Sequence, residues 1–130
     1  KYDPFSSWIK LLENIEYEHL HSLYKDVDLG IFASTCENHP NIILEYMGCS
    51  LPFISSYREP MRSITENLTY YFNPEDPEDI SKNIKKIIKD EEFRKLLSIK
   101  LSKLINNYSW EECSRKTFSF LYKTYEKNSF

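Results

Sequence analysis

The sequence predicts an α/β fold in which a parallel sheet is followed by a set of C-terminal helices. Short apolar runs alternate with segments whose apolar residues recur at helical spacing, as in proteins with parallel sheets. The run at residues 29–33 is short and apolar, as in a strand buried on both faces. The last third of the chain shows only helical spacing. The predicted order is strand, helix, strand, helix, strand, loop, strand and three helices.

The first elements follow from apolar spacing. Residues 8–12, WIKLL, form an apolar run that predicts a strand. Residues 16–26 place Leu20, Leu23 and Tyr24 on one helical face, with acids at the start and a lysine near the end, as the helix dipole favours. The strand at residues 29–33 follows this helix.

Prolines mark the middle of the chain. Pro40 can occupy the first position of a helix that runs to about Cys49, because the N–H it lacks has no partner there. Pro52 stands at the beginning of a second buried strand, residues 51–56, where proline is tolerated. Residues 68–72, LTYYF, predict a further strand.

Capping signals define the C-terminal helices. Asp76 as the cap and Pro77 at the first position open a helix that is acidic at its start and rich in lysine towards its end. Residues 91–107 continue as another helix. Ser109 and Glu112 match the S-x-x-E capping box, which predicts a final helix to about Lys127.

Composition limits the function. The chain has 130 residues, enough for one domain, and its 41% hydrophobic content predicts folding. A net charge of −3 gives no electrostatic case for nucleic-acid binding. Two glycines cannot form a G-x-G-x-x-G loop. Three scattered cysteines indicate reduced thiols in a cytoplasmic protein and no zinc site, and no stretch approaches the ~20 apolar residues of a membrane span.

A candidate site lies at residues 34–41, between the strand at 29–33 and the next helix, because parallel sheets bind ligands at the carboxyl ends of their strands. Glu37 falls in this loop, and Glu45 falls about one and a half turns into the helix. The helix N-terminus suits a phosphate or diphosphate. Carboxylates accept hydrogen bonds from hydroxyl groups. A sugar nucleotide combines these groups.

A simpler interpretation accounts for the same residues. Acids are frequent here, so two glutamates eight positions apart are expected about once by chance, and spacing alone is weak evidence. Glu45 would then be a solvent-facing residue of an amphipathic helix, and Glu37 an ordinary loop acid.

Residues 23–56 resemble the donor-binding segment of family 4 retaining glycosyltransferases, which have the two-domain GT-B fold. The tail, from YYFNPEDPED to the Ser-Trp-Glu helix, also resembles this family, so the resemblance covers roughly residues 9–126. The matching positions are Leu23, Tyr24, Asp28, Ser34, Glu37, Pro40, Asn41, Glu45, Met47 and Pro52.

The resemblance implies a role for each residue of the E-x7-E segment. Glu37 would contact the transferred sugar at the reaction centre, the backbone amides of Asn38, His39, Pro40 and Asn41 would surround sugar and diphosphate (proline contributing position only), and Glu45 would bind the ribose. The chain would be a single, partial donor-binding domain, the Rossmann-like part of a GT-B C-terminal domain. The donor would be a UDP- or GDP-type sugar, with no metal and no other cofactor.

The acceptor, a glycan or lipid-linked molecule, would bind an N-terminal domain that this chain lacks, and the full-length enzyme could associate peripherally with a membrane. We therefore expect this chain alone to be inactive in sugar transfer, to bind donor weakly and to have an exposed or rearranged sheet edge. The alternative is a non-catalytic, degenerate module that acts through a partner polypeptide.

Some positions depart from the family pattern. Gly30 replaces a bulky strand residue, Ala33 replaces a proline, and Ser50 replaces the glycine before the x-Pro turn. The family's glycine-rich loop after the second strand is missing. Arg58 and Arg62 lie there instead, either as phosphate ligands or as ordinary surface arginines. His39 is either a sugar contact or a solvent-facing loop residue.

Overall fold

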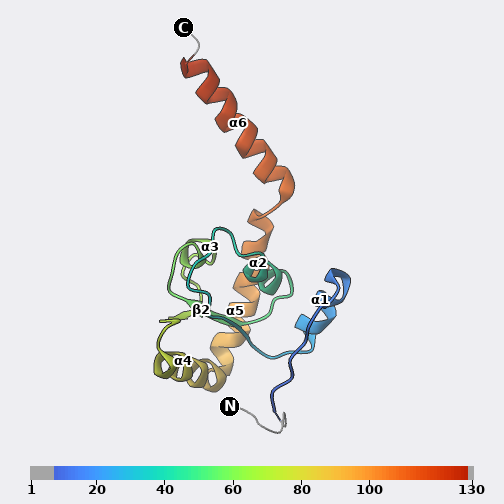
Figure 1. Cartoon of the computed structure of the whole chain (residues 1–130), viewed down its shortest axis with the longest axis vertical. Coiled ribbons are helices and arrows are strands. Elements are labelled where there is room, and N and C mark those ends of the chain that lie inside the picture. Colours follow the sequence, from blue (N-terminus) through green and yellow to red (C-terminus); the bar gives the residue numbers. More distant parts are fainter. Residues whose placement is uncertain (1–7, 129–130) are drawn as a thin grey trace.

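The computed structural model describes residues 8–128, in which three short parallel strands form a sheet with helices around it (Figure 1). The predicted α/β class is confirmed. The elements are α1 (Tyr17–Lys25), β1 (Gly30–Phe32), α2 (Asn41–Gly48), β2 (Phe53–Ser56), α3 (Met61–Ile64), β3 (Tyr70–Phe72), α4 (Pro77–Lys89), α5 (Glu91–Leu104), a 3-10 turn η1 (Ile105–Asn107) and α6 (Trp110–Asn128).

The strands lie in the order β1-β2-β3, and both pairings are parallel. Gly30 is opposite Phe53, and Ile54 is opposite Tyr70. All four residues of β2 are buried, as predicted for a central parallel strand. In β1, however, Ile31 is 42% exposed. The prediction of a strand buried on both faces is wrong there, because β1 is an edge strand and the described residues leave that face partly open.

The hydrophobic core joins the sheet to α2, α3, α4 and α5. Ile43 and Met47 of α2 face Leu97 and Leu101 of α5, and all four are buried. The fully buried side chains of the sheet and the remaining helices complete the core. They are Phe53, Ile54, Met61, Phe72 and Ile87.

The strand predicted at residues 8–12 is not formed. Trp8 is 72% exposed and Leu11 is 79% exposed. A short apolar run becomes a strand only when a sheet pairs with it and a core covers it, and spacing alone does not reveal either. Residues 61–64, expected as loop, form the short helix α3 instead.

The helix boundaries largely follow the predicted caps. Asp76 accepts hydrogen bonds from the backbone N–H groups of Glu78 and Asp79, and Pro77 is the first residue of α4. Pro40 precedes α2 as its N-cap residue rather than occupying its first position. The helix predicted at residues 91–107 ends at Leu104 and tightens into η1.

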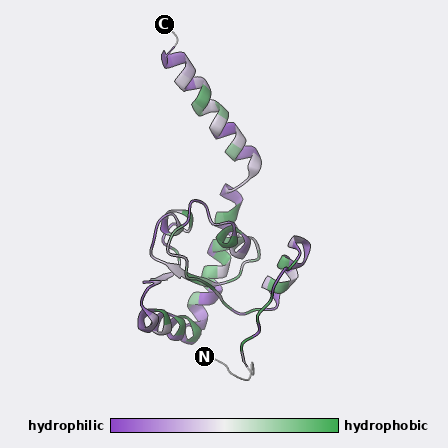
Figure 2. Cartoon of the chain, viewed as in Figure 1, coloured by the Kyte–Doolittle hydropathy of each residue, from purple (hydrophilic) through white to green (hydrophobic). Residues whose placement is uncertain are grey.

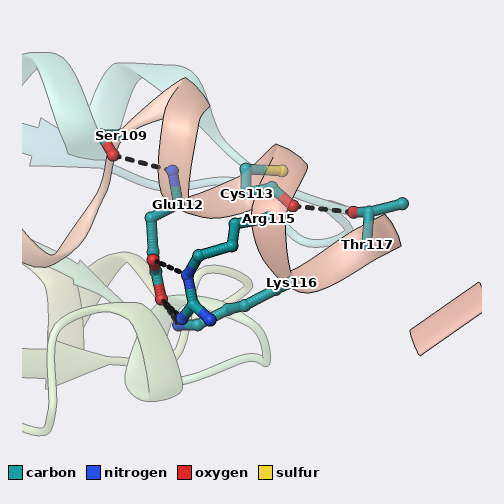
Figure 3. A network of polar contacts seen from close by, with 6 residues as sticks. All are labelled: Ser109, Glu112, Cys113, Arg115, Lys116 and Thr117. Atoms are coloured by element: carbon teal, nitrogen blue, oxygen red, sulfur yellow. Dashed lines mark hydrogen bonds and ion pairs between the residues drawn. The ribbon is translucent and has the colours of Figure 1, made fainter. Parts of the chain in front are cut away.

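Ser109 caps the start of α6, because its hydroxyl oxygen accepts a hydrogen bond of 3.1 Å from the Glu112 N–H (Figure 3). The second half of the predicted capping box is replaced, because the Glu112 carboxylate turns to the Arg115 guanidinium at 2.6 and 2.7 Å. The helix projects away from the body of the molecule (Figure 1) and alternates polar with apolar residues (Figure 2). Its large apolar side chains are exposed: Trp110, Phe118, Phe120, Leu121, Tyr122 and Tyr125.

The turn after α2 is a Schellman motif built on a serine. The N–H of Leu51 donates to the carbonyl of Tyr46 at 2.9 Å, and the N–H of Ser50 donates to that of Met47 at 3.0 Å. Ser50 has φ of 55°, in the left-handed region where glycine is favoured. The departure from glycine noted in the sequence therefore carries backbone strain.

Gly30 leaves room for an aromatic ring. A Cβ atom at Gly30 would lie 2.8 Å from Cε2 of Tyr46. The Tyr46 ring is held in place between the rings of Tyr24 and Phe53, with centroids 5.2 and 5.5 Å away. The small residue in β1 is thus explained by the large residue in α2.

Ser50→Gly is expected to raise the free energy of unfolding by about 0.5–1 kcal/mol, because glycine adopts the left-handed conformation without the Cβ penalty but loses more chain entropy on folding. Urea denaturation followed by circular dichroism measures the change. Ser50→Ala, which keeps a Cβ atom, should bring no gain, and an equal gain with alanine would contradict the role assigned to backbone strain.

Gly30→Ala is expected to lower the free energy of unfolding by about 1–3 kcal/mol, because the new methyl group overlaps the Tyr46 ring. The matched control is Gly48→Ala in α2, where a Cβ atom meets nothing within 4 Å. That change should be neutral or stabilising by up to about 1 kcal/mol. Similar losses at both positions in denaturant melts would refute the steric explanation.

The Glu112–Arg115 pair predicts a pH dependence in α6. Hydrogen bonds from Arg115 lower the pKa of Glu112 to about 2, from 4.5. Since the folded-state pKa is depressed, the stabilisation is complete above the unfolded value and disappears as the pH falls through about 2. The carboxyl ¹³C shift of Glu112 should titrate near pH 2. Arg115→Gln should raise the titration midpoint of Glu112 more than Lys116→Gln does. The Arg115 guanidinium lies 2.6 Å from the Glu112 carboxylate, whereas the Lys116 ammonium lies 3.4 Å from it. A midpoint near 4.5 in the unaltered chain would contradict the pairing.

Candidate functional site

The candidate site lies where the parallel strands end and the following helices begin. The chain passes from β1 through residues 33–40 into α2, as predicted from the sequence. Residues 57–60 connect β2 to α3, and residues 73–76 connect β3 to α4. Because the strands are parallel, these three connections leave the same edge of the sheet.

The N-terminus of α2 is available to an anion. Pro40 makes no side-chain cap, and the first turn of α2 contains no acidic residue. The N–H of Ile43 bonds back to the Pro40 carbonyl at 3.2 Å. The first amide groups of the helix, beginning at Asn41, therefore have no capping side chain from the described part of the chain, which is the arrangement that binds phosphate oxygens.

The two glutamates flank this helix start. Glu37 is half-buried in the loop before α2, and Asn38 and His39 beside it are exposed. Glu45 is half-buried and follows Asn41 by four residues, about 6 Å along the helix axis. The backbone thus separates the two carboxylates along α2 rather than pairing them.

Glu45 is anchored to α1. The Tyr24 hydroxyl donates a 2.8 Å hydrogen bond to Oε2 of Glu45, across 21 sequence positions. The solvent-facing interpretation of Glu45 is therefore incomplete. Sequence reasoning missed this contact, since Tyr24 was placed on the helical face by apolar spacing alone and not as a hydrogen-bond donor.

Burial and the Glu45 charge affect the neighbouring pKa values. Burial, followed by the hydrogen bond to Glu45, raises the pKa of Tyr24 well above its ordinary value of 10.0. Burial and then Glu45 raise the pKa of Tyr46. Burial raises the pKa of the Cys49 thiol, with Lys25 opposing and Glu45 adding to the effect. These three side chains stay protonated and neutral at physiological pH. They therefore bring no second negative charge close to Glu45.

The His39 ring lies near Tyr108, which precedes α6. Its ring centroid lies 6.5 Å from that of Tyr108, whose hydroxyl donates to the Ile64 carbonyl at 3.1 Å. His39 is exposed and in a loop. Both interpretations of His39, as a sugar contact and as a loop histidine, stay predictions.

The two arginines after β2 have partners within the chain. Arg58 pairs with Glu75 at 2.6 Å and lies 4.9 Å from the centroid of the Tyr57 ring. Nε of Arg62 donates to the side-chain oxygen of Asn67 at 3.1 Å. A role as phosphate ligands would require them to leave these contacts. No local pattern indicates Glu75 as the partner of Arg58, because the pair joins two loops that only the sheet brings together.

Ser55 and Ser56 contribute buried polar groups to β2. Both residues are fully buried, and their hydroxyl oxygens have no hydrogen-bond partner among the described residues. An apolar strand pattern does not single out these two serines.

Within residues 8–128, no three histidine, cysteine or acidic side chains gather as a metal site would need, and no helix is long and apolar enough to cross a membrane.

The fold and the position of the candidate site define a class, an α/β domain with a parallel sheet whose candidate ligand edge lies at the carboxyl ends of its strands. Residues 7–103 match the family described as glycosyl transferases group 1. The chain therefore belongs to this family.

Two similar proteins agree with this assignment. The chain is 25% identical over 112 residues to O-antigen chain mannosyltransferase B of Escherichia coli, covering 86% of this chain and 29% of that protein. It superimposes with a TM-score of 0.78 on sucrose-phosphate synthase of Thermosynechococcus elongatus, at 17% identity, over 92% of this chain and 31% of the other. The second likeness confirms the GT-B type of fold. The chain spans less than a third of the length of either protein.

Proposed function

We propose that this chain is the donor-binding part of a retaining glycosyltransferase of family 4. The whole glycosyltransferase would transfer a hexose from a UDP- or GDP-type sugar without a metal. The observation that carries the proposal is the uncapped N-terminus of α2 between two half-buried glutamates, at the strand-end edge of the sheet. Membership of the glycosyl transferases group 1 family supports the reaction class.

Each residue of the site would bind a different part of the nucleotide sugar. Glu37, in the loop, would accept hydrogen bonds from the transferred sugar at the reaction centre. The backbone N–H groups of Asn38, His39 and Asn41 and the positive end of α2 would bind the diphosphate and stabilise its charge as it leaves, with Pro40 setting the loop's position. Glu45 would accept hydrogen bonds from the ribose hydroxyls.

The acceptor would be a glycan or a lipid-linked molecule held by a further domain, since the chain spans less than a third of its matched relatives. The relative named as an O-antigen chain mannosyltransferase supports a hexose donor and a role in glycan biosynthesis. We place the enzyme in the cytoplasm, with peripheral association at a membrane where a lipid-linked acceptor would be found.

A second candidate is a non-catalytic module that acts through a partner polypeptide. The observation in its favour is that Arg58 and Arg62 are paired with Glu75 and Asn67, so neither cation is directed at a diphosphate. Sugar transfer by a longer polypeptide that includes a second domain, together with its loss in Glu37→Gln, would exclude this candidate.

Glu45→Ala is expected to weaken UDP or GDP binding by about tenfold or more, because hydrogen bonds to a charged group each contribute roughly 1.5–3 kcal/mol. NMR titration of the 130-residue chain at millimolar nucleotide suits the weak binding expected of it. Glu92→Ala is the matched control, an exposed glutamate in the first turn of α5. Unchanged affinity in Glu45→Ala would remove the ribose role, and sugar transfer by this chain alone would contradict the expected inactivity.

A further inference from the structure

The contact between Tyr24 and Glu45 links α1 to the proposed donor site. The Tyr24 hydroxyl donates to Oε2 of Glu45 at 2.8 Å, and both side chains are half-buried. The phenol is a neutral donor and brings no charge of its own to the carboxylate. Since the pKa of Tyr24 is raised, the hydroxyl keeps its proton throughout the physiological range.

The Tyr24 ring packs against a second aromatic ring. It meets the Tyr46 ring edge to face, with centroids 5.2 Å apart and planes at 87°. Tyr46 packs in turn on Phe53 of the central strand, and its ring fills the space above Gly30. Tyr46 therefore links the Tyr24 ring, which carries the hydroxyl, to the central strand.

A fixed carboxylate is a better acceptor for a ribose than a free one. A glutamate carboxylate has about four lone-pair positions, and Tyr24 occupies one of them, which leaves enough for two hydroxyl groups. A free glutamate would lose side-chain entropy when a ligand orders it. Here the hydrogen bond from Tyr24 orders the Glu45 side chain before a ligand binds, which favours affinity for the ligand. The same bond orients the other carboxylate oxygen, Oε1.

We propose that Tyr24 is a positioning residue that holds the Glu45 carboxylate so that its free lone pairs meet the 2′- and 3′-hydroxyl groups of the donor ribose. The inference rests on the proposed function and deepens it. It assigns to a tyrosine outside the E-x7-E segment a share in the preference for ribonucleotides over nucleotides that lack these hydroxyls.

The test compares ribonucleotides with their 2′,3′-dideoxy counterparts. UDP and GDP, and the dideoxy form of each, are titrated by NMR into the chain and into Tyr24→Phe, Glu45→Gln and the double variant. Tyr24→Phe removes one oxygen and keeps the ring. We expect it to reduce the ribo-to-dideoxy affinity ratio by about threefold to tenfold, the range for one lost hydrogen bond, and to leave dideoxy affinity unchanged.

Two controls complete the design. In the Glu45→Gln background, removal of the Tyr24 hydroxyl should have no further effect on the ratio, because the two residues act as one unit. Tyr70→Phe removes another tyrosine hydroxyl that donates to a carboxylate, that of Asp90 at 3.3 Å, and should leave the ratio unchanged.

The outcomes separate this inference from the proposed function. Equal losses for ribo- and dideoxynucleotides in Tyr24→Phe would show a merely structural role and overturn the inference. A retained ratio in Tyr24→Phe together with a lost ratio in Glu45→Gln would overturn the role of Tyr24 and leave that of Glu45 standing. If the unaltered chain shows no preference for either ribonucleotide, the proposed ribose site fails and the inference fails with it.

Discussion

The parallel pairing of β2 with β1 on one side and β3 on the other is the constraint on which the rest of the structure depends. All four residues of β2 are buried, and Phe53 and Ile54 belong to the same core as α2 and α5. Parallel pairing brings the carboxyl ends of all three strands to one edge. The β1–α2 loop with Glu37, the start of α2 and the loops carrying Arg58 and Glu75 are together because β2 sets their common origin.

From β2, a column of aromatic rings reaches the proposed ribose site. Phe53, Tyr46 and Tyr24 pack in sequence, and pairs of this kind contribute about 0.5–1.5 kcal/mol each beyond the area they bury. Gly30 makes the column possible, since any larger side chain would meet the Tyr46 ring. Gly30 stands where the family that the sequence resembles has a bulky strand residue, and its small size accommodates the Tyr46 ring.

The charged side chains at this edge decide which groups of a ligand it would suit. Glu37 and Glu45 bring negative charge, while Arg58 is paired with Glu75 and Arg62 is bonded to Asn67. The positive potential for a diphosphate then comes first from the α2 N-terminus, whose effect is limited to its first turn. If the proposed function holds, such an edge would suit the hydroxyl groups of a ligand better than its phosphates.

The sequence by itself determined the local structure: the buried strand β2, the strand β3, the Asp76–Pro77 start of α4, the serine cap of α6 and the loop-to-helix position of both glutamates. These features depend on neighbours within a few residues, so short-range spacing and capping reveal them. Only the tertiary structure decided that residues 8–12 form no strand, that Ile31 is open and that Tyr24 holds Glu45. Each of these features depends on contacts between residues that are far apart in the sequence, and such contacts leave no periodic pattern in the sequence.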